Sequence, residues 1–176
     1  GITMNSKEDV SLRKYIASLL KKNLREGGRK PFEYRNIKIE TDVLSQANGS
    51  ARVKFGDAEV FVGVKVGLGS PFPDTPNDGV LMVNGELSPL ASEDFETGPP
   101  SPRSIEVSRV IDRAIRESGT IDTSKLCIEP GEKVWMVFVD VYPLNEDGNL
   151  FDAGLLGAIA ALKTARMPAF DKKTGK

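Results

Sequence analysis

The sequence contains no histidine and only one cysteine, Cys127, among its 176 residues. Without histidine there can be no Ser-His-Asp triad and no zinc site with imidazole ligands. A single cysteine can close no internal disulfide and cannot supply a cysteine-rich metal or iron–sulfur site. Any catalysis by this chain would therefore rest on carboxylates, lysine, tyrosine, hydroxyl groups or an oxygen-bound metal.

The sequence also has no excess of charge of one sign and no long apolar run. Lysine and arginine number 24 against 25 aspartates and glutamates, so the chain as a whole is no general binder of polyanions. A nucleic-acid site would have to be a local cluster of basic residues. No stretch approaches the roughly 20 apolar residues of a membrane span, no signal-peptide pattern opens the chain, and a free cysteine is typical of reducing compartments. We therefore expect a cytoplasmic protein without a membrane partner.

The hydrophobic pattern predicts the order helix, four strands, helix, strand and helix, which is an α+β or mixed α/β fold. We expect residues 9–167 to form one domain, residues 1–8 to be a tag or a disordered N-terminus, and residues 168–176 to be a polar tail. The predicted helices span residues 9–24, 101–117 and 153–165, and the predicted strands span residues 36–44, 52–55, 59–68, 80–87 and 133–142.

Local signals refine this order. The Asn48-Gly49 pair predicts a tight hairpin, and Gly56-Asp57 predicts a second turn. Residues 67–70 lack the lysine and the following helix of a phosphate loop, so a plain loop is expected there. Residues 133–142 are almost wholly apolar, which predicts a central strand covered on both faces. Asp140 within this strand is expected to be hydrogen-bonded rather than to act as a catalytic acid.

The predicted helix over residues 101–117 carries the most informative polar pattern. At about 100° per residue, one arc of roughly 140° contains Arg103, Glu106, Arg109, Arg113 and Arg116. Another arc, expected to face the sheet, contains Val107, Val110, Ile111 and Ala114. Guanidinium groups match phosphate oxygens and stay charged at any working pH. On the pattern alone, however, a solvated helix face with Glu106 paired to an arginine is the more frequent explanation. The same holds for the basic cluster between Lys21 and Arg35.

Four segments together resemble the ribonuclease PH family. They are residues 49–60, 83–91, 103–116 and 140–149, in family order. The resemblance covers about residues 9–167 and is strongest to the non-catalytic ring subunits of the archaeal exosome. It implies a ribonuclease PH-like fold, a βαβ sandwich of the ribosomal protein S5 domain 2 type, that would be incomplete at the C-terminus of this chain.

Two departures from the catalytic members imply that the chain is no enzyme by itself. Those members have a Gly-Gly-Thr-Arg-like phosphate loop where this sequence continues from Gly148-Asn149 into Leu150-Phe151-Asp152. The hydroxyl and the guanidinium group that would bind inorganic phosphate are missing there. The family's catalytic aspartates lie in a second half that would follow residues 153–165. The resemblance thus implies neither a catalytic residue nor a metal site in this chain.

The resemblance implies a component of the exosome, a 3'-5' RNA-degrading complex. Such subunits alternate with catalytic ribonuclease PH-type partners in a ring of three heterodimers and help to structure the partner's active site, where magnesium and inorganic phosphate would bind. RNA-binding cap subunits and single-stranded RNA would be further partners.

Carried over to this sequence, Arg109 and Arg113 would be the main contacts to RNA phosphates, with Arg103 and Arg116 as weaker ones, and Glu106 would orient the arginines. Two alternatives stay open. One is a phosphorolytic 3'-5' exoribonuclease in its own right, and the other is a purely structural module whose arginines form salt bridges at an interface.

Overall fold

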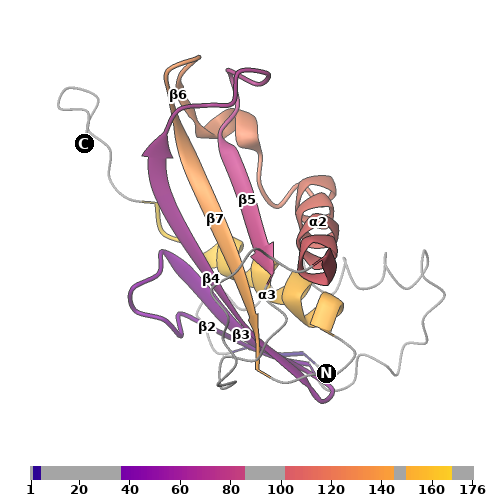
Figure 1. Cartoon of the computed structure of the whole chain (residues 1–176). Helices are drawn as coiled ribbons and strands as arrows, with labels where there is room; N and C mark the ends of the chain where they lie inside the picture. Colours follow the sequence, from indigo (N-terminus) through magenta and orange to yellow (C-terminus); the bar gives the residue numbers. More distant parts are fainter. Residues whose placement is uncertain (1, 5–36, 86–101, 145–149, 168–176) are drawn as a thin grey trace.

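The computed structural model describes residues 2–4, 37–85, 102–144 and 150–167, and it places two helices on one face of a mixed sheet (Figure 1). The strands are β1 Ile2–Met4, β2 Ile37–Thr41, β3 Gly49–Phe55, β4 Ala58–Gly69, β5 Val80–Gly85, β6 Cys127–Glu129 and β7 Lys133–Pro143. The helices are α2 Pro102–Glu117, α3 Leu150–Thr164 and the short 3-10 helix η2 Thr123–Leu126. The predicted α+β class is confirmed, whereas the predicted helix over residues 9–24 lies outside the described residues.

The sheet has seven strands in the order β1-β2-β3-β4-β7-β5, with β6 paired to β7. β2, β3 and β4 form an antiparallel meander. β7 then inserts between β4 and β5, antiparallel to β4 and parallel to β5 (Figure 1). Parallel neighbours need a crossover connection, and α2 provides it, so that β5, α2 and β7 form a βαβ unit. β5 is left as the last strand on this side of the sheet.

The start of the chain differs from the prediction. Residues 2–4 form β1, which pairs in parallel with β2 from Ile2 opposite Ile37 to Met4 opposite Ile39. These three residues belong to the span expected to precede the domain, and the structure pairs them with the sheet. Their Ile-Thr-Met sequence is compatible with a short strand.

The tight turn of the meander lies at Gly56-Asp57, as predicted. Phe55 pairs directly with Ala58 across this turn, and Gly56 has a φ of 58°. A positive φ costs glycine little because it has no Cβ. β2 and β3 are joined differently, by a longer segment over residues 42–48. The prediction of a tight hairpin at Asn48-Gly49 is therefore wrong.

Asn48 and Gly49 contact β4 and α3 instead of forming a turn. The backbone N–H of Asn48 donates to the carbonyl of Val64 at 2.9 Å, and its side-chain Oδ1 accepts from the N–H of Val66 at 3.0 Å. Gly49 begins β3 beneath α3, where a Cβ would overlap the carbonyl oxygen of Ala161. The glycine is thus required by the close approach of a helix, which a local sequence signal does not reveal.

The hydrophobic core lies between the sheet and the two helices. α3 packs against β3 and β4, and α2 packs against β5 and α3. Successive residues of a strand point to opposite faces, and the residues of β4 and β7 that point toward the helices are at most 3% exposed: Val60, Val62, Val64, Val137, Val139 and Val141. Small residues of α3 allow this approach, as at Gly154, where a Cβ would lie 3.1 Å from Ile111 Cδ1 of α2.

The other face of β7 is only half-buried. Its residues there are Met136, Phe138, Asp140 and Tyr142. The prediction that β7 is a central strand is confirmed, but the prediction that both of its faces are covered is wrong, because α2 and α3 cover one face alone. No helix in the described part of the chain is long and apolar enough to cross a membrane.

Candidate functional site

The rotation of α2 about its own axis is set by three buried residues. Val107, Ile111 and Ile115 are at most 4% exposed and recur every four residues, so they form one apolar stripe. Val110 is 49% exposed, which contradicts the prediction that it faces the sheet. At 100° per residue, Ile111 and Ile115 lie on one side of Val107 around the helix axis. Val110 lies about 60° from Val107 on the other side, and therefore outside this stripe. Ile115, which the sequence pattern did not single out, completes the stripe in its place.

The arginines of α2 therefore face away from the core. The residues predicted to lie in the polar arc are exposed wherever their side chains are described, namely Glu106, Arg109, Arg113 and Arg116. The side chain of Arg103 lies outside the described residues. The prediction that these charged side chains point away from the core is thus confirmed from Glu106 onward.

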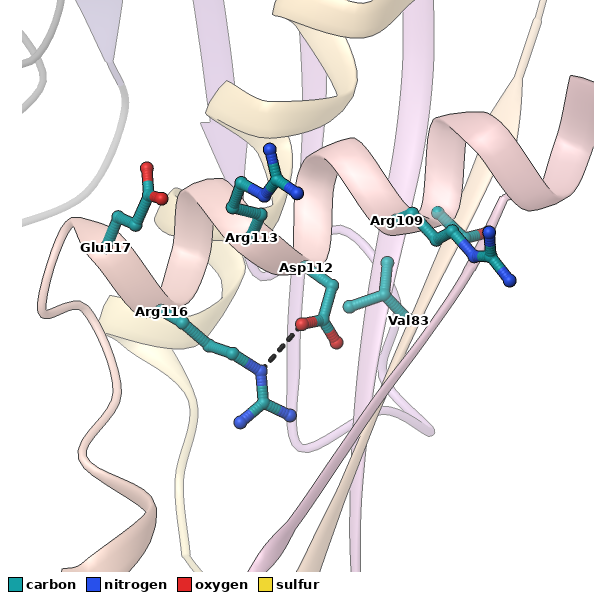
Figure 2. Close-up of a pocket in the computed structure, with 7 residues that line it drawn as sticks. Val83, Arg109, Asp112, Arg113, Arg116 and Glu117 are labelled. Atoms are coloured by element: carbon teal, nitrogen blue, oxygen red, sulfur yellow. Dashed lines mark hydrogen bonds and ion pairs between the residues drawn. The ribbon is translucent and has the colours of Figure 1, made fainter.

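Three of these arginines border an open groove beside α2 and β5. The groove has a volume of about 470 Å³ and is lined by Val83, Ser108, Arg109, Asp112, Arg113, Arg116 and Glu117 (Figure 2). Three guanidinium groups outnumber two carboxylates, so the lining has a net positive charge. Glu106 is not part of the lining. A groove of this charge can attract an anion such as a phosphodiester.

Arg116 is engaged within the protein. Its Nε donates to Oδ1 of Asp112 at 2.6 Å, and its Nη2 donates to the carbonyl oxygen of Leu81 in β5 at 3.4 Å. Figure 2 shows both side chains of the ion pair on the side of α2 where Val83 lies. Asp112 was not among the predicted site residues. Its spacing of four residues from Arg116 on a helix is the sequence signal that could have indicated this pair.

Arg109 and Arg113 are not engaged in this way. Within the described part of the chain neither has an ion pair or a side-chain hydrogen bond, and the same is true of Glu106. In Figure 2 the side chains of Arg113 and Glu117 extend from the side of α2 opposite to Asp112 and Arg116. The pairing of Glu106 with an arginine is not found among these residues, and its role in orienting the arginines stays a prediction. As far as the described residues go, two guanidinium groups are thus available to bind phosphate oxygens.

A second contact ties α2 to β5. The hydroxyl of Ser108 accepts a hydrogen bond from the backbone N–H of Gly85 at 2.7 Å. α2 also lies close to this end of β5, because a Cβ on Gly85 would be 3.2 Å from Val107 Cγ1. Ser108 lies within the helix sequence without a motif around it, so sequence reasoning did not find this contact.

The remaining candidates have no part in the groove. Asp140 accepts a hydrogen bond from Asn84 Nδ2 at 3.2 Å, which confirms the prediction of a hydrogen-bonded carboxylate. Residues 67–69 belong to β4, which confirms the strand predicted over residues 59–68, whereas the loop predicted over residues 67–70 is wrong except at Ser70. The basic cluster between Lys21 and Arg35, residues 145–149 and the side chains of Leu150 and Phe151 lie outside the described residues. Among the described residues no three of Asp, Glu and Cys gather to hold a metal ion.

Comparison with known proteins places this helix and sheet in a family. The ribonuclease PH model, described as 3' exoribonuclease family, domain 1, matches residues 33–168. The chain is 60% identical over 156 residues to the "Exosome complex component Rrp42" of Methanocella arvoryzae, with 89% of this chain and 60% of that protein aligned. It therefore spans about 60% of the length of this curated relative.

Solved structures agree with this match. The structure described as "archaeoglobus fulgidus exosome with RNA bound to the active site" has a TM-score of 0.72 and 55% identity, over 89% of this chain and 62% of that one. The structure described as "Archaeal exosome core" has a TM-score of 0.66 and 48% identity, over 91% and 62%. The predicted ribonuclease PH-like fold is thus confirmed. The chain belongs to the 3' exoribonuclease family, and its residues 33–168 correspond to the first domain of that family.

Proposed function

We propose that this chain is part of a non-catalytic component of the exosome and that α2 grips RNA by its phosphates. The observation that carries the proposal is the pair Arg109 and Arg113, which border a groove of net positive charge without a partner among the described residues. The similarity to exosome proteins named Rrp42, and to an exosome structure described as having RNA bound, supports it.

The proposed binding mode is independent of the RNA sequence. Guanidinium groups bind phosphate oxygens in bidentate fashion, and contacts to phosphates position a nucleic acid without reading its bases. Such a mode suits a protein that must hold any single strand while a partner shortens it. Arg109 and Arg113 would make the main contacts, and Arg103 would make a weaker one.

The same proposal covers the assembly. The chain would join a catalytic ribonuclease PH-type subunit as one half of a heterodimer, three of which form a ring in the cytoplasm, and RNA-binding cap subunits would complete the complex. Magnesium and inorganic phosphate would bind in the partner's site. The resemblance supports this division of roles, because it aligns Leu150 and Phe151 with the hydroxyl and the guanidinium group of the catalytic members' phosphate loop.

Replacement of Arg113 tests the proposal. Arg113→Ala should weaken binding of a single-stranded RNA and should lower the slope of log K against log salt concentration by about 0.7, the value for one phosphate contact on a single strand. Arg109→Ala should do the same. The binding constants can be measured by fluorescence anisotropy of a labelled RNA over a series of salt concentrations.

Arg166→Ala is the matched control, because Arg166 is also an exposed arginine but follows the end of α3. It should leave the slope unchanged. A slope that stays constant in Arg109→Ala and Arg113→Ala as well would refute RNA binding by α2 and favour the structural module. Phosphate-dependent shortening of RNA by the chain alone would instead support an exoribonuclease in its own right.

A further inference from the structure

Asp112 is the one carboxylate on α2 that is spaced three or four residues from two of the groove arginines. Arg116 follows it by four residues and Arg109 precedes it by three. Side chains three and four residues apart are neighbours on a helix surface. The carboxylate can therefore pair with either arginine. If it pairs with Arg116, the guanidinium group of Arg109 is available to a ligand.

In the structure Asp112 pairs with Arg116 and not with Arg109. Asp112 Oδ1 accepts from Arg116 Nε at 2.6 Å, and Arg109 has no ion pair with any residue that the structure describes. The side chains of Arg116 and Asp112 are 47% and 30% exposed, so the pair lies at the rim of the groove and not in the core. A ligand in the groove would meet Arg109 unpaired and Arg116 already occupied.

Arg116 is held from two directions. Its Nη2 reaches the carbonyl oxygen of Leu81 on β5 at 3.4 Å while its Nε binds Asp112 on α2. An RNA phosphate that recruited this guanidinium group would have to displace acceptors on two different elements. Together with the hydrogen bond between Ser108 and Gly85, the contact to Leu81 ties α2 to both ends of β5, and Val83 at the groove lies between these ties.

We propose that Arg116 is a positioning residue for RNA binding and not an RNA contact. By occupying Asp112 it prevents this carboxylate from pairing with Arg109, and so keeps the Arg109 guanidinium group free for a phosphate. The inference rests on the proposed function of α2 and differs from the expectation drawn from the sequence pattern, in which Arg116 is a weak phosphate contact.

The test compares single and double replacements in the full 176-residue chain, with salt-dependent binding of a labelled single-stranded RNA as the readout. Arg116→Ala should lower the salt slope by about 0.7, because the freed Asp112 captures Arg109. The double variant Asp112→Ala with Arg116→Ala should return the slope to the wild-type value, since no carboxylate is then left to compete. Arg116→Lys should also keep the wild-type slope, because lysine can still pair with Asp112.

A direct contact gives a different pattern. If Arg116 itself binds a phosphate, the double variant keeps the loss of slope seen in Arg116→Ala, and this result would overturn the inference. Asp112→Ala alone measures the general effect of removing one negative charge, and circular dichroism verifies that each variant is folded.

The two proposals can fail separately. If Arg109→Ala and Arg113→Ala both leave the salt slope unchanged, the proposed function fails and the inference falls with it. If they lower the slope while the double variant is not restored, RNA binding by α2 stands and only the positioning role of Arg116 is overturned.

Discussion

Individual glycines set the distance between α3 and the sheet. Gly157 of α3 lies over Val62 of β4, where a Cβ would come within 2.6 Å of Val62 Cγ2. Gly49 of β3 lies under Ala161 and Ala165, where a Cβ would meet main-chain atoms that cannot rotate away. These contacts explain why the helix needs small residues: any larger side chain at the contact would lift α3 from the valines of the sheet.

Gly49→Ala should therefore destabilise the protein. Its Cβ would overlap the carbonyl oxygen of Ala161 and lie 2.8 Å from the Cβ of Ala165, and overpacking of this kind lowers the free energy of unfolding by about 1–3 kcal/mol. Gly67→Ala is the matched control in β4, because no atom lies within 4 Å of its Cβ position. It should raise the free energy of unfolding slightly, since glycine in a strand costs roughly 0.5–1 kcal/mol against alanine. Urea titration measures both, and equal effects would refute the packing argument.

Elements were predictable where their signals are local. The helical spacing over residues 101–117 and the apolar run at residues 133–142 indicated α2 and β7 correctly, because periodicity and hydrophobicity are signals carried by neighbouring residues. η2 and β6 were missed since they are four and three residues long and carry no periodicity. The Asn48-Gly49 pair misled because a helix more than 100 residues later requires the glycine. In the groove, the arginine face followed from helix spacing, but the contacts to Leu81 and Gly85 depend on where β5 lies.

η2 begins with a cap whose strength should depend on pH. Oδ1 of Asp122 accepts hydrogen bonds from Ser124 Oγ at 2.6 Å and from the Ser124 N–H at 3.0 Å. The Ser124 hydroxyl above all, then its N–H, lower the pKa of Asp122 from the ordinary 3.8. Because the folded pKa lies below the unfolded one, the ionised cap stabilises the fold above pH 3.8 and this contribution is lost as the pH falls through the folded value.

Asp122→Ala should accordingly lower the melting temperature at neutral pH, and the difference from wild type should shrink on acidification below pH 3.8. Thermal unfolding of both proteins between neutral and acid pH measures this. Ser124→Ala should show the same loss to a smaller extent, because it removes the hydroxyl donor while keeping the carboxylate and the N–H donor. A difference that stays constant over the whole pH range would contradict the cap.

At the scale of the molecule, β7 connects the meander to the βαβ unit that carries the groove. It pairs with β4 from Val134 to Pro143 and with β5 from Met136 to Val141. α2 packs on β5, which is the edge strand on this side of the sheet. The position of the arginines on α2 therefore depends on the pairing of β5 with β7. A weakened β7 should loosen the groove and the core together.

Val139→Ala tests this dependence. Val139 is fully buried in β7 between Val64 of β4 and Val83 of β5, and loss of two methyl groups there should lower the free energy of unfolding by roughly 2 kcal/mol. Val110→Ala is the matched control, because Val110 is 49% exposed and its replacement should change the free energy of unfolding by less than about 0.5 kcal/mol.

The sole tryptophan, Trp135, lies in β7, so its fluorescence reports on this strand while far-UV circular dichroism reports on the helices. Since β7 holds both halves of the sheet, the two probes should give coincident transitions in wild type and in Val139→Ala. Separate transitions would mean that α2 and β5 can detach while the meander stays folded.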